Sequence, residues 1–151
     1  MLDDVDKRLL RTLQRNGQIT AQELGEVLGL SASQAGRRRQ RLEAEGLITH
    51  YAAQIDPEPL GLSIQAFVQV HLGTHGPEAA RDISRLIHSR TEITSAWTMT
   101  GEADYLLRVW TPDLKALHRL IHDVLLPHPA VARVQSQIVM DQLKTDAPLP
   151  L

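Results

Sequence analysis

The sequence predicts an α+β protein in two parts, a small helical part followed by a layered α/β sandwich, and three observations predict it. Residues 3–45 carry apolar side chains at helical spacing, interrupted by short turns. Residues 56–61, D-P-E-P-L-G, contain two prolines and a glycine, which break both helices and strands. Residues 62–144 then alternate strand-like and helical stretches in the order βαββαβ.

The first part is predicted to be a helix-turn-helix. Thr20 is followed three residues later by Glu23, and Ser31 by Gln34, and each pair has the spacing of a capping box at a helix start. Gly29 provides the tight turn between the two capped helices. The expected helices cover residues 3–15, 21–28 and 32–45, and a rudimentary wing strand is expected from 47 to 55.

The basic side chains of the first part are concentrated in the third predicted helix. The whole sequence has 16 Lys+Arg against 18 Asp+Glu, so its net charge of −2 does not indicate nucleic-acid binding. Residues 1–55 hold 8 basic side chains, however, and half of these lie between positions 37 and 41. An arginine-rich second helix of a helix-turn-helix is typical of a DNA reader.

The first half of that helix is the half that enters the major groove in this motif. We assign Gln34 and Arg38 as base readers, because amide and guanidinium groups pair with base edges. Ser33, Arg37 and Arg41 are expected to contact phosphates. Arg39 lies four residues after Ala35, on the side that should face the core, so either its stem passes the core with the head outside or the helix is rotated.

The second part is predicted to be a ferredoxin-like βαββαβ sandwich. Ile93, Ser95 and Trp97 are expected on one face of their strand, and Ala96 on the other face with Phe67 and Leu106. The sheet would then be apolar on both faces, which calls for a second covering layer, most simply another copy of the chain. The expected strands are Ile64–Leu72, Ile93–Met99, Tyr105–Trp110 and Val131–Met140, and the helices are 77–88 and 112–126, the second with Leu114, Leu117, Ile121 and Val124 inward.

Composition excludes several other classes of protein. The chain has no cysteine, so disulfides and thiolate metal sites are absent and a reducing cytoplasm is expected. No apolar run is long enough to cross a membrane, and the acidic start M-L-D-D-V-D is unlike a signal peptide. His118 and His122 are i,i+4 on one helix but have no well-placed third ligand, so we expect no metal site. We also expect no cofactor and no catalytic residues, because no nucleophile–base pair or dinucleotide fingerprint occurs.

The order of these parts resembles the Lrp/AsnC family of transcription regulators, and the resemblance covers nearly the whole chain. It implies binding to double-stranded DNA, a small amino acid as effector, and a homodimer that assembles further, for example to an octamer. It also implies that residues 1–55 form the DNA-binding domain and that residues 62–144 bind the effector and join the subunits. Residues 56–61 would form the hinge between them, and residues 145–151 would form a C-terminal tail. The stretches that carry it are 2–17, 23–31, 41–48, 100–109 (T-G-E-A-D-Y-L-L-R-V) and 136–144.

By the same resemblance, the hairpin turn at 100–104 lines the effector pocket at a subunit interface. Thr100 and Gly101 would leave backbone N–H groups for a carboxylate, and Glu102 or Asp104 would pair with an ammonium. Ser136 on the last strand is a further candidate, from the partner side. An ordinary hairpin turn explains the glycine and the aspartate equally well from the residues alone.

Two other functions are compatible with this order of domains. Siroheme decarboxylases resemble the family in domain order and use the second domain for porphyrin chemistry. They have no need of the capped, arginine-dense helix at 31–45, so the enzyme is the alternative rather than the first hypothesis. A stand-alone amino-acid sensor is disfavoured by the intact first part.

Overall fold

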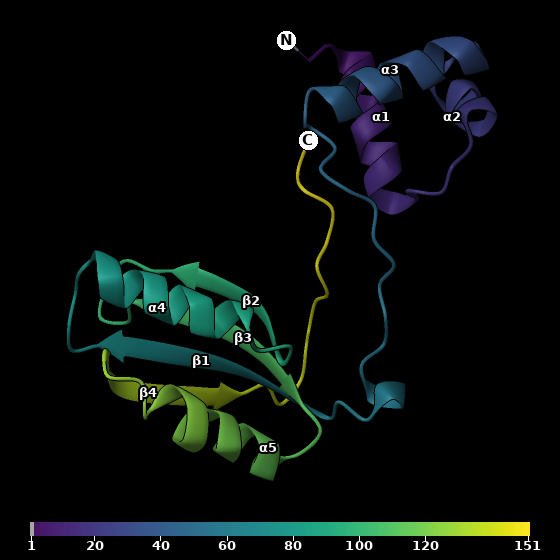
Figure 1. Cartoon of the computed structure of the whole chain (residues 1–151). Helices are drawn as coiled ribbons and strands as arrows, with labels where there is room; N and C mark the ends of the chain where they lie inside the picture. Colours follow the sequence, from purple (N-terminus) through teal and green to yellow (C-terminus); the bar gives the residue numbers. More distant parts are fainter. Residues whose placement is uncertain (1) are drawn as a thin grey trace. The chain divides into compact units, whose positions relative to one another are not determined.

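A computed structural model describes residues 2–151, and the chain packs as two compact units. The first contains residues up to Gln54 together with Leu143–Leu151, and the second contains Ile55–Gln142. The first unit is helical, and the second contains a sheet with helices (Figure 1). The predicted α+β class, a helix-turn-helix followed by a βαββαβ sandwich, is confirmed.

The first unit is built on helices α1 (Asp4–Arg15), α2 (Ala21–Leu28) and α3 (Ala32–Ala44). Each helix begins with a capping box, at Asp3, Thr20 and Ser31 respectively, so each start is specified locally. The core of this unit consists of aliphatic side chains from all three helices and the first turn: Leu9, Leu13, Ile19, Leu24, Leu28, Ala35 and Leu42.

The strand expected over residues 47–55 is wrong, because the structure has no regular element there. The N–H groups of Leu47 and Ile48 both bond to the carbonyl of Leu42, at 3.0 and 3.3 Å, so the segment starts as the cap of α3. A strand also needs a partner strand, and none of the described residues pairs with this segment. A single 3₁₀ turn, Glu58–Leu60, follows in the proline-rich linker.

The second unit contains a four-stranded antiparallel sheet in the order β2-β3-β1-β4, with helices packed against one face (Figure 1). The strands are β1 (Ile64–Leu72), β2 (Ile93–Thr98), β3 (Tyr105–Thr111) and β4 (Val131–Ile138). Helix α4 (Pro77–His88) and helix α5 (Leu114–Arg119), which continues as a π-helical turn at Leu120–Leu125, supply the covering layer. The fully buried centre of the sheet is Ala66, Val68, Val70, Leu107 and Val109.

Strand β2 differs from the prediction in which residues face the helices. Ile93 pairs with Val109 but Ser95 pairs with Arg108, so Thr94 is an extra residue in the strand. This bulge reverses the alternation, which places Ile93 with the core and Trp97 on the uncovered face. Ala96, expected with Phe67 and Leu106 on the uncovered face, instead pairs with Leu107 on the helix side.

The π-helical turn changes the apolar stripe of the second covering helix in the same way. A π turn holds one more residue than an α turn, so it shifts the residues that follow it around the helix. Leu120 and Leu125 are therefore buried, while Ile121 and Val124 are only partly buried. Leu114 was expected inward and is 57% exposed, because it lies in the first turn just after the cap Asp113.

Candidate nucleic-acid and effector sites

The helix-turn-helix is held in shape by reciprocal hydrogen bonds at both of its capped helices. Thr20 Oγ1 accepts from the Glu23 N–H at 3.2 Å, and the Glu23 carboxylate accepts from the Thr20 N–H at 2.8 Å. The Ser31 hydroxyl and the Gln34 amide oxygen make the equivalent bonds at 3.2 and 3.0 Å. Because these bonds satisfy otherwise free N–H groups, the start of α3 has a defined geometry before any ligand binds.

The turn between α2 and α3 depends on two glycines. Gly29 has φ of +72°, a conformation that side chains disfavour. Gly25 packs so closely that a Cβ atom there would lie 2.7 Å from the carbonyl oxygen of Leu30. The second helix of the motif can therefore approach the first only because Gly25 lacks a side chain, while Gly29 provides the positive φ of the turn.

One side of α3 faces the core of the first unit and the other is open. Ala35 and Leu42 are fully buried, whereas Ser33, Arg37 and Arg41 are exposed at successive intervals of four residues. Among residues 2–151, the Arg37 side chain makes no hydrogen bond or ion pair. Three of the five predicted site residues, Ser33, Arg37 and Arg41, thus form an exposed stripe on α3 that ends in basic side chains.

Two of the predicted DNA contacts are also bound within the unit. Arg38 Nη1 donates to Asp3 Oδ2 at 2.7 Å and to Asp6 Oδ1 at 2.8 Å. Arg41 Nη2 donates to Asp6 Oδ2 at 2.6 Å. Both arginines are therefore oriented by carboxylates of α1 and its cap. Their remaining N–H groups do not take part in these bonds.

Asp6 is the residue that the sequence argument missed. Its side chain is fully buried, and it is spaced three and seven residues before Leu9 and Leu13, on the apolar stripe of α1. A carboxylate on an apolar stripe indicates a buried cationic partner, so this spacing was an available signal. Burial alone would raise the pKa of Asp6, but hydrogen bonds from Arg38, Arg41 and the Asp3 N–H outweigh it and lower the pKa below its ordinary value.

The turn proposed to bind the effector joins β2 to β3 in the second unit. Gly101 has φ of +102°, as the turn requires, and Thr100, Gly101 and Glu102 are exposed. Asp104 is committed elsewhere: its carboxylate accepts from the Leu72 N–H at 2.7 Å and contacts His75 Nε2 at 2.9 Å. The Leu72 N–H is the main cause that lowers the pKa of Asp104, burial opposes it, and His75 lowers it further.

Residues from β1 and β4 reach this turn although no sequence pattern joined them to it. Arg133 Nη2 lies 3.8 Å from Glu102 Oε2 and 3.0 Å from Nε2 of the buried His71. A guanidinium only donates, so Nε2 of His71 is the acceptor in this contact. His71 and Arg133 are opposite each other in the β1–β4 register, a proximity that only strand pairing creates.

Ser136 is not brought to the turn within one chain. It lies on the edge strand β4, opposite Val68, and β1 separates β4 from β3. If Ser136 contacts an effector bound at the turn, it must therefore belong to a partner copy of the chain. Among the described residues, His, Asp and Glu nowhere gather in a group of three that could hold a metal ion. His118 and His122 instead stack on each other, with ring centroids 4.2 Å apart.

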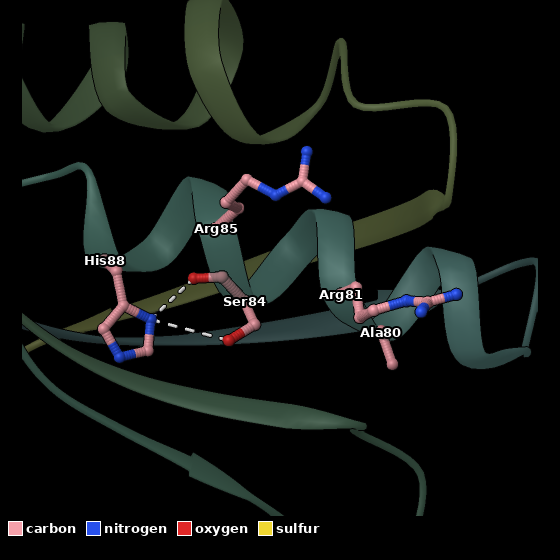
Figure 2. Close-up of a pocket in the computed structure, with 5 residues that line it drawn as sticks. All are labelled: Ala80, Arg81, Ser84, Arg85 and His88. Carbon is pink, nitrogen blue, oxygen red and sulfur yellow. Dashed lines mark hydrogen bonds between the residues drawn. The ribbon is translucent and has the colours of Figure 1, made fainter.

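Two hollows in the second unit lie outside both predicted sites. A groove of about 500 Å³ on α4 is lined by Ala80, Arg81, Ser84, Arg85 and His88, and Figure 2 shows His88 bonded to Ser84 within it. A larger hollow of about 590 Å³ lies at the start of α4 and includes His75 and His128. Neither contains a residue of the 100–104 turn, so these hollows do not form the expected effector pocket. Within residues 2–151, no helix combines the length and apolar character needed to cross a membrane.

Comparison with known proteins agrees with this geometry. Residues 2–43 match the AsnC-type helix-turn-helix domain, and residues 65–149 match the Lrp/AsnC ligand binding domain. The chain is 32% identical over 151 residues to the DNA-binding transcriptional activator DecR of Escherichia coli K12, covering 100% of this chain and 99% of that protein. It is 32% identical over 143 residues to the leucine-responsive regulatory protein of the same strain, covering 95% and 87%.

Solved structures give the same result. The chain superimposes on a Neisseria meningitidis transcriptional regulator, crystallised as its L-Met complex, with a TM-score of 0.95 and 36% identity over 99% of this chain and 97% of that one. These relatives are transcription regulators, not enzymes, so the decarboxylase-like alternative is set aside. The chain belongs to the Lrp/AsnC family of DNA-binding transcriptional regulators.

Proposed function

We propose that this regulator binds operator DNA as a homodimer through the exposed stripe of α3, and that an α-amino acid bound at the 100–104 turn controls it. The first unit then provides the DNA contacts, and the second unit provides the effector site and the subunit contacts. The observation that carries the proposal is the arginine-bearing face of α3, which points away from the core on a helix whose start is fixed by capping bonds. Such a regulator acts on chromosomal DNA, which places it in the cytoplasm.

The arginines of α3 have different tasks in this proposal. Arg38 is oriented by Asp3 and Asp6 through Nη1 alone, so Nε and Nη2 can present a two-donor edge to a guanine. Gln34 is the second base reader. Ser33, Arg37 and Arg41, the exposed stripe, contact phosphates. Pre-orientation matters because a side chain that is already ordered loses less conformational entropy on binding.

Arg37→Ala is the cleanest test of the DNA site, because this side chain has no other partner among the described residues. DNA affinity measured by fluorescence anisotropy should fall on every sequence, and the slope of log affinity against log salt should decrease by about 1. Arg85→Ala is the matched control, since this exposed arginine lies on α4 of the second unit. A flat salt dependence of the wild-type protein, or equal losses in both variants, would refute the DNA site.

The effector proposal is supported by the chemistry of the turn and by the relatives. One relative is called leucine-responsive and another was solved with L-Met, and both names indicate amino acids. An α-amino acid needs an anionic and a cationic group side by side, and Glu102 and Arg133 supply both at the edge of the turn. Asp104 holds the turn in shape through Leu72, so Glu102 is the better acceptor for the ammonium.

A thermal-shift screen of the twenty amino acids tests this site. A ligand present at 100 times its dissociation constant stabilises the folded protein by about 2.7 kcal/mol, which is readily detected. Glu102→Gln should abolish the shift, whereas Glu58→Gln, a control in the linker, should leave it unchanged. If no amino acid shifts the wild-type transition, the effector site is refuted.

The dimer is proposed from the face of the sheet that the helices leave uncovered. Phe67 and Leu106 lie on this face and are half-buried, and Trp97 beside them is 44% exposed. A second copy would bury these side chains and would bring two recognition helices to two half-sites. Light scattering should give at least the mass of a dimer, and Leu106→Arg should lower it. A monomeric wild-type protein would refute this part of the proposal.

A further inference from the structure

Arg39 occupies a position on the inner side of α3 that geometry reserves for apolar residues. It lies four residues after Ala35 and three before Leu42, and both of these are fully buried. Neither of the two sequence alternatives describes it. The helix is not rotated, since Ala35 and Leu42 face the core, and the guanidinium is not in open solvent, because the side chain is only 24% exposed.

One edge of the guanidinium binds the loop between α1 and α2. Nη1 donates to the carbonyl of Ile19 at 3.0 Å, and Nη2 donates to the carbonyl of Gly17 at 3.3 Å. These carbonyls lie beyond the end of α1, so they have no partner in a helix. Arg39 thus satisfies free carbonyl groups of the loop, as a polar cap satisfies free backbone groups at a helix end, and it holds the loop against α3.

The other edge binds a side chain that follows α3. Nε donates to Tyr51 Oη at 2.9 Å and to Glu43 Oε1 at 3.1 Å, and Tyr51 Oη donates to the same carboxylate oxygen at 2.8 Å. The guanidinium carbon lies 4.7 Å from the centroid of the Tyr51 ring, which adds a cation–π contact. The ring also covers Gly17, where a Cβ atom would be 2.9 Å from Tyr51 Cδ1.

Tyr51 is significant because of where it lies in the chain. Residues 49–54 belong to the first unit but have no regular secondary structure, and the second unit begins at Ile55. The course of this segment is therefore fixed by side-chain contacts rather than by a helix or a strand. The contacts among Arg39, Glu43 and Tyr51, which we call the exit clamp, link the segment directly to the recognition helix.

We propose that Arg39 is a positioning residue that acts through Tyr51 to fix the direction in which the chain leaves the DNA-binding unit. The inference rests on the proposed dimer, in which each recognition helix is joined to the shared second units through this segment and through the C-terminal residues 143–151. A fixed exit direction restricts the separation and angle of the two helices, and so determines which spacing of half-sites the dimer binds best. Without the clamp the segment samples more directions and the spacing preference becomes broad.

The test compares the wild-type protein with Arg39→Leu and Tyr51→Phe on two kinds of DNA. One set carries two half-sites whose separation is changed one base pair at a time, and the other carries a single half-site. The ratio of affinities between the best spacing and its neighbours should fall about fivefold or more in both variants, the usual size of a coupling between sites. Affinity for the single half-site should stay unchanged, because neither residue touches DNA in the proposed site.

Hydrogen–deuterium exchange of peptides from 47–54 provides a readout that is independent of DNA. Exchange should be faster in both variants, while peptides from α4 should exchange as in the wild-type protein. Should Arg39→Leu not fold, Tyr51→Phe carries the test alone, since it removes one hydroxyl from an exposed ring. Arg39→Lys should behave like Arg39→Leu, because an ammonium cannot span both edges of the clamp.

Three results would overturn the inference. Unchanged spacing preference in the variants would show that the exit direction does not depend on the clamp. A loss on the single half-site equal to the loss on the paired sites would show that Arg39 only supports α3. A wild-type protein that binds DNA without any spacing preference would also refute it. Failure of the wild-type protein to bind DNA at all is distinguishable, because it refutes the DNA site itself.

Discussion

Asp6→Asn is expected to destabilise the helix-turn-helix selectively. The substitution keeps the shape of the side chain but replaces one carboxylate oxygen by an NH₂ group. That group would face Arg41 Nη2, which now donates to Asp6 at 2.6 Å, or Arg38 Nη1, which donates at 2.8 Å. Either way two donors oppose each other at a position that is fully buried.

The magnitude follows from the bonds that are lost. A hydrogen bond to a charged group contributes about 1.5–3 kcal/mol, and an unsatisfied buried donor costs about 1–3 kcal/mol. The arginines keep part of their hydration, since their side chains are 31% and 47% exposed, which reduces both amounts. We expect a loss of about 2–3 kcal/mol, equivalent to a decrease of roughly 15–20 °C in the melting temperature of a unit of this size.

The assay can separate the two units because both tryptophans lie in the second. Trp97 and Trp110 report the sheet unit by fluorescence, whereas more of the helical circular dichroism at 222 nm comes from the first unit. The helical midpoint should fall and the tryptophan midpoint should not. Asp4→Asn is the matched control, on the same helix with a side chain 98% exposed, and should change stability by less than about 0.5 kcal/mol. A helical midpoint for Asp6→Asn within about 2 °C of the wild-type value would refute the reasoning.

The pH dependence provides a second measurement of the same carboxylate. The pKa of Asp6 is lower in the folded state than in the unfolded state, so its contribution is present above about pH 4 and is lost as the pH falls through the folded-state pKa. Asp6→Asn should remove this part of the acid sensitivity. In addition, Arg41→Ala should cost at least about 1 kcal/mol less in the Asp6→Asn background than in the wild-type protein. Strict additivity would show that the two side chains do not interact.

Three further substitutions, together with one control substitution, have outcomes that follow directly from the structure. Gly25→Ala places a Cβ atom 2.7 Å from a carbonyl of the α2–α3 turn and should lower the free energy of unfolding by about 1–3 kcal/mol in urea titrations; a neutral result would disprove the close contact. Ser31→Ala removes the cap of α3 and should cost about 1 kcal/mol, whereas the exposed Ser33→Ala should be near neutral; equal effects would contradict the capping role. Asp104→Asn weakens the bond to the Leu72 N–H. Because the folded-state pKa of Asp104 is lowered, the wild-type protein should lose stability below about pH 4, and the variant should lose less when unfolding is followed by tryptophan fluorescence. An unchanged dependence of stability on acid pH would count against this role of Asp104.

The elements of the fold were predictable because their signals are local. Helices α1 to α4 follow from capping boxes, a proline at a helix start and helical spacing of apolar residues, all of which act within one or two turns. Strand β1 was predicted with the bounds it has, Ile64–Leu72. Two errors occur where the regular period is interrupted, at the bulge of Thr94 and at the π turn of Leu120–Leu125, and a third is the strand expected over residues 47–55. The insertion of one residue cannot be recognised from amino-acid composition, but it changes the face on which every later residue of the element lies.

The candidate sites were predictable only in part. The stripe of α3 follows from helical spacing, so the exposure of Ser33, Arg37 and Arg41 is a local property of the sequence, whereas their contacts with DNA stay a prediction. The bonds from Arg38 and Arg41 to Asp6 join residues 32 and 35 positions apart, which no local pattern connects. The same holds for His71 and Arg133, which are 62 residues apart and meet only through strand pairing.

The sequence by itself therefore determined most of the elements and their order, because caps, glycine turns and periodicity are properties of neighbouring residues, and its resemblance to known regulators indicated the family. Only the tertiary structure decided how the charged side chains are used. It pairs Asp6 with two arginines of the recognition helix, commits Asp104 to the backbone of β1, and places Arg39 between a loop and Tyr51. A buried charge is stable only where distant residues supply its partners, and only the folded chain determines which partners those are.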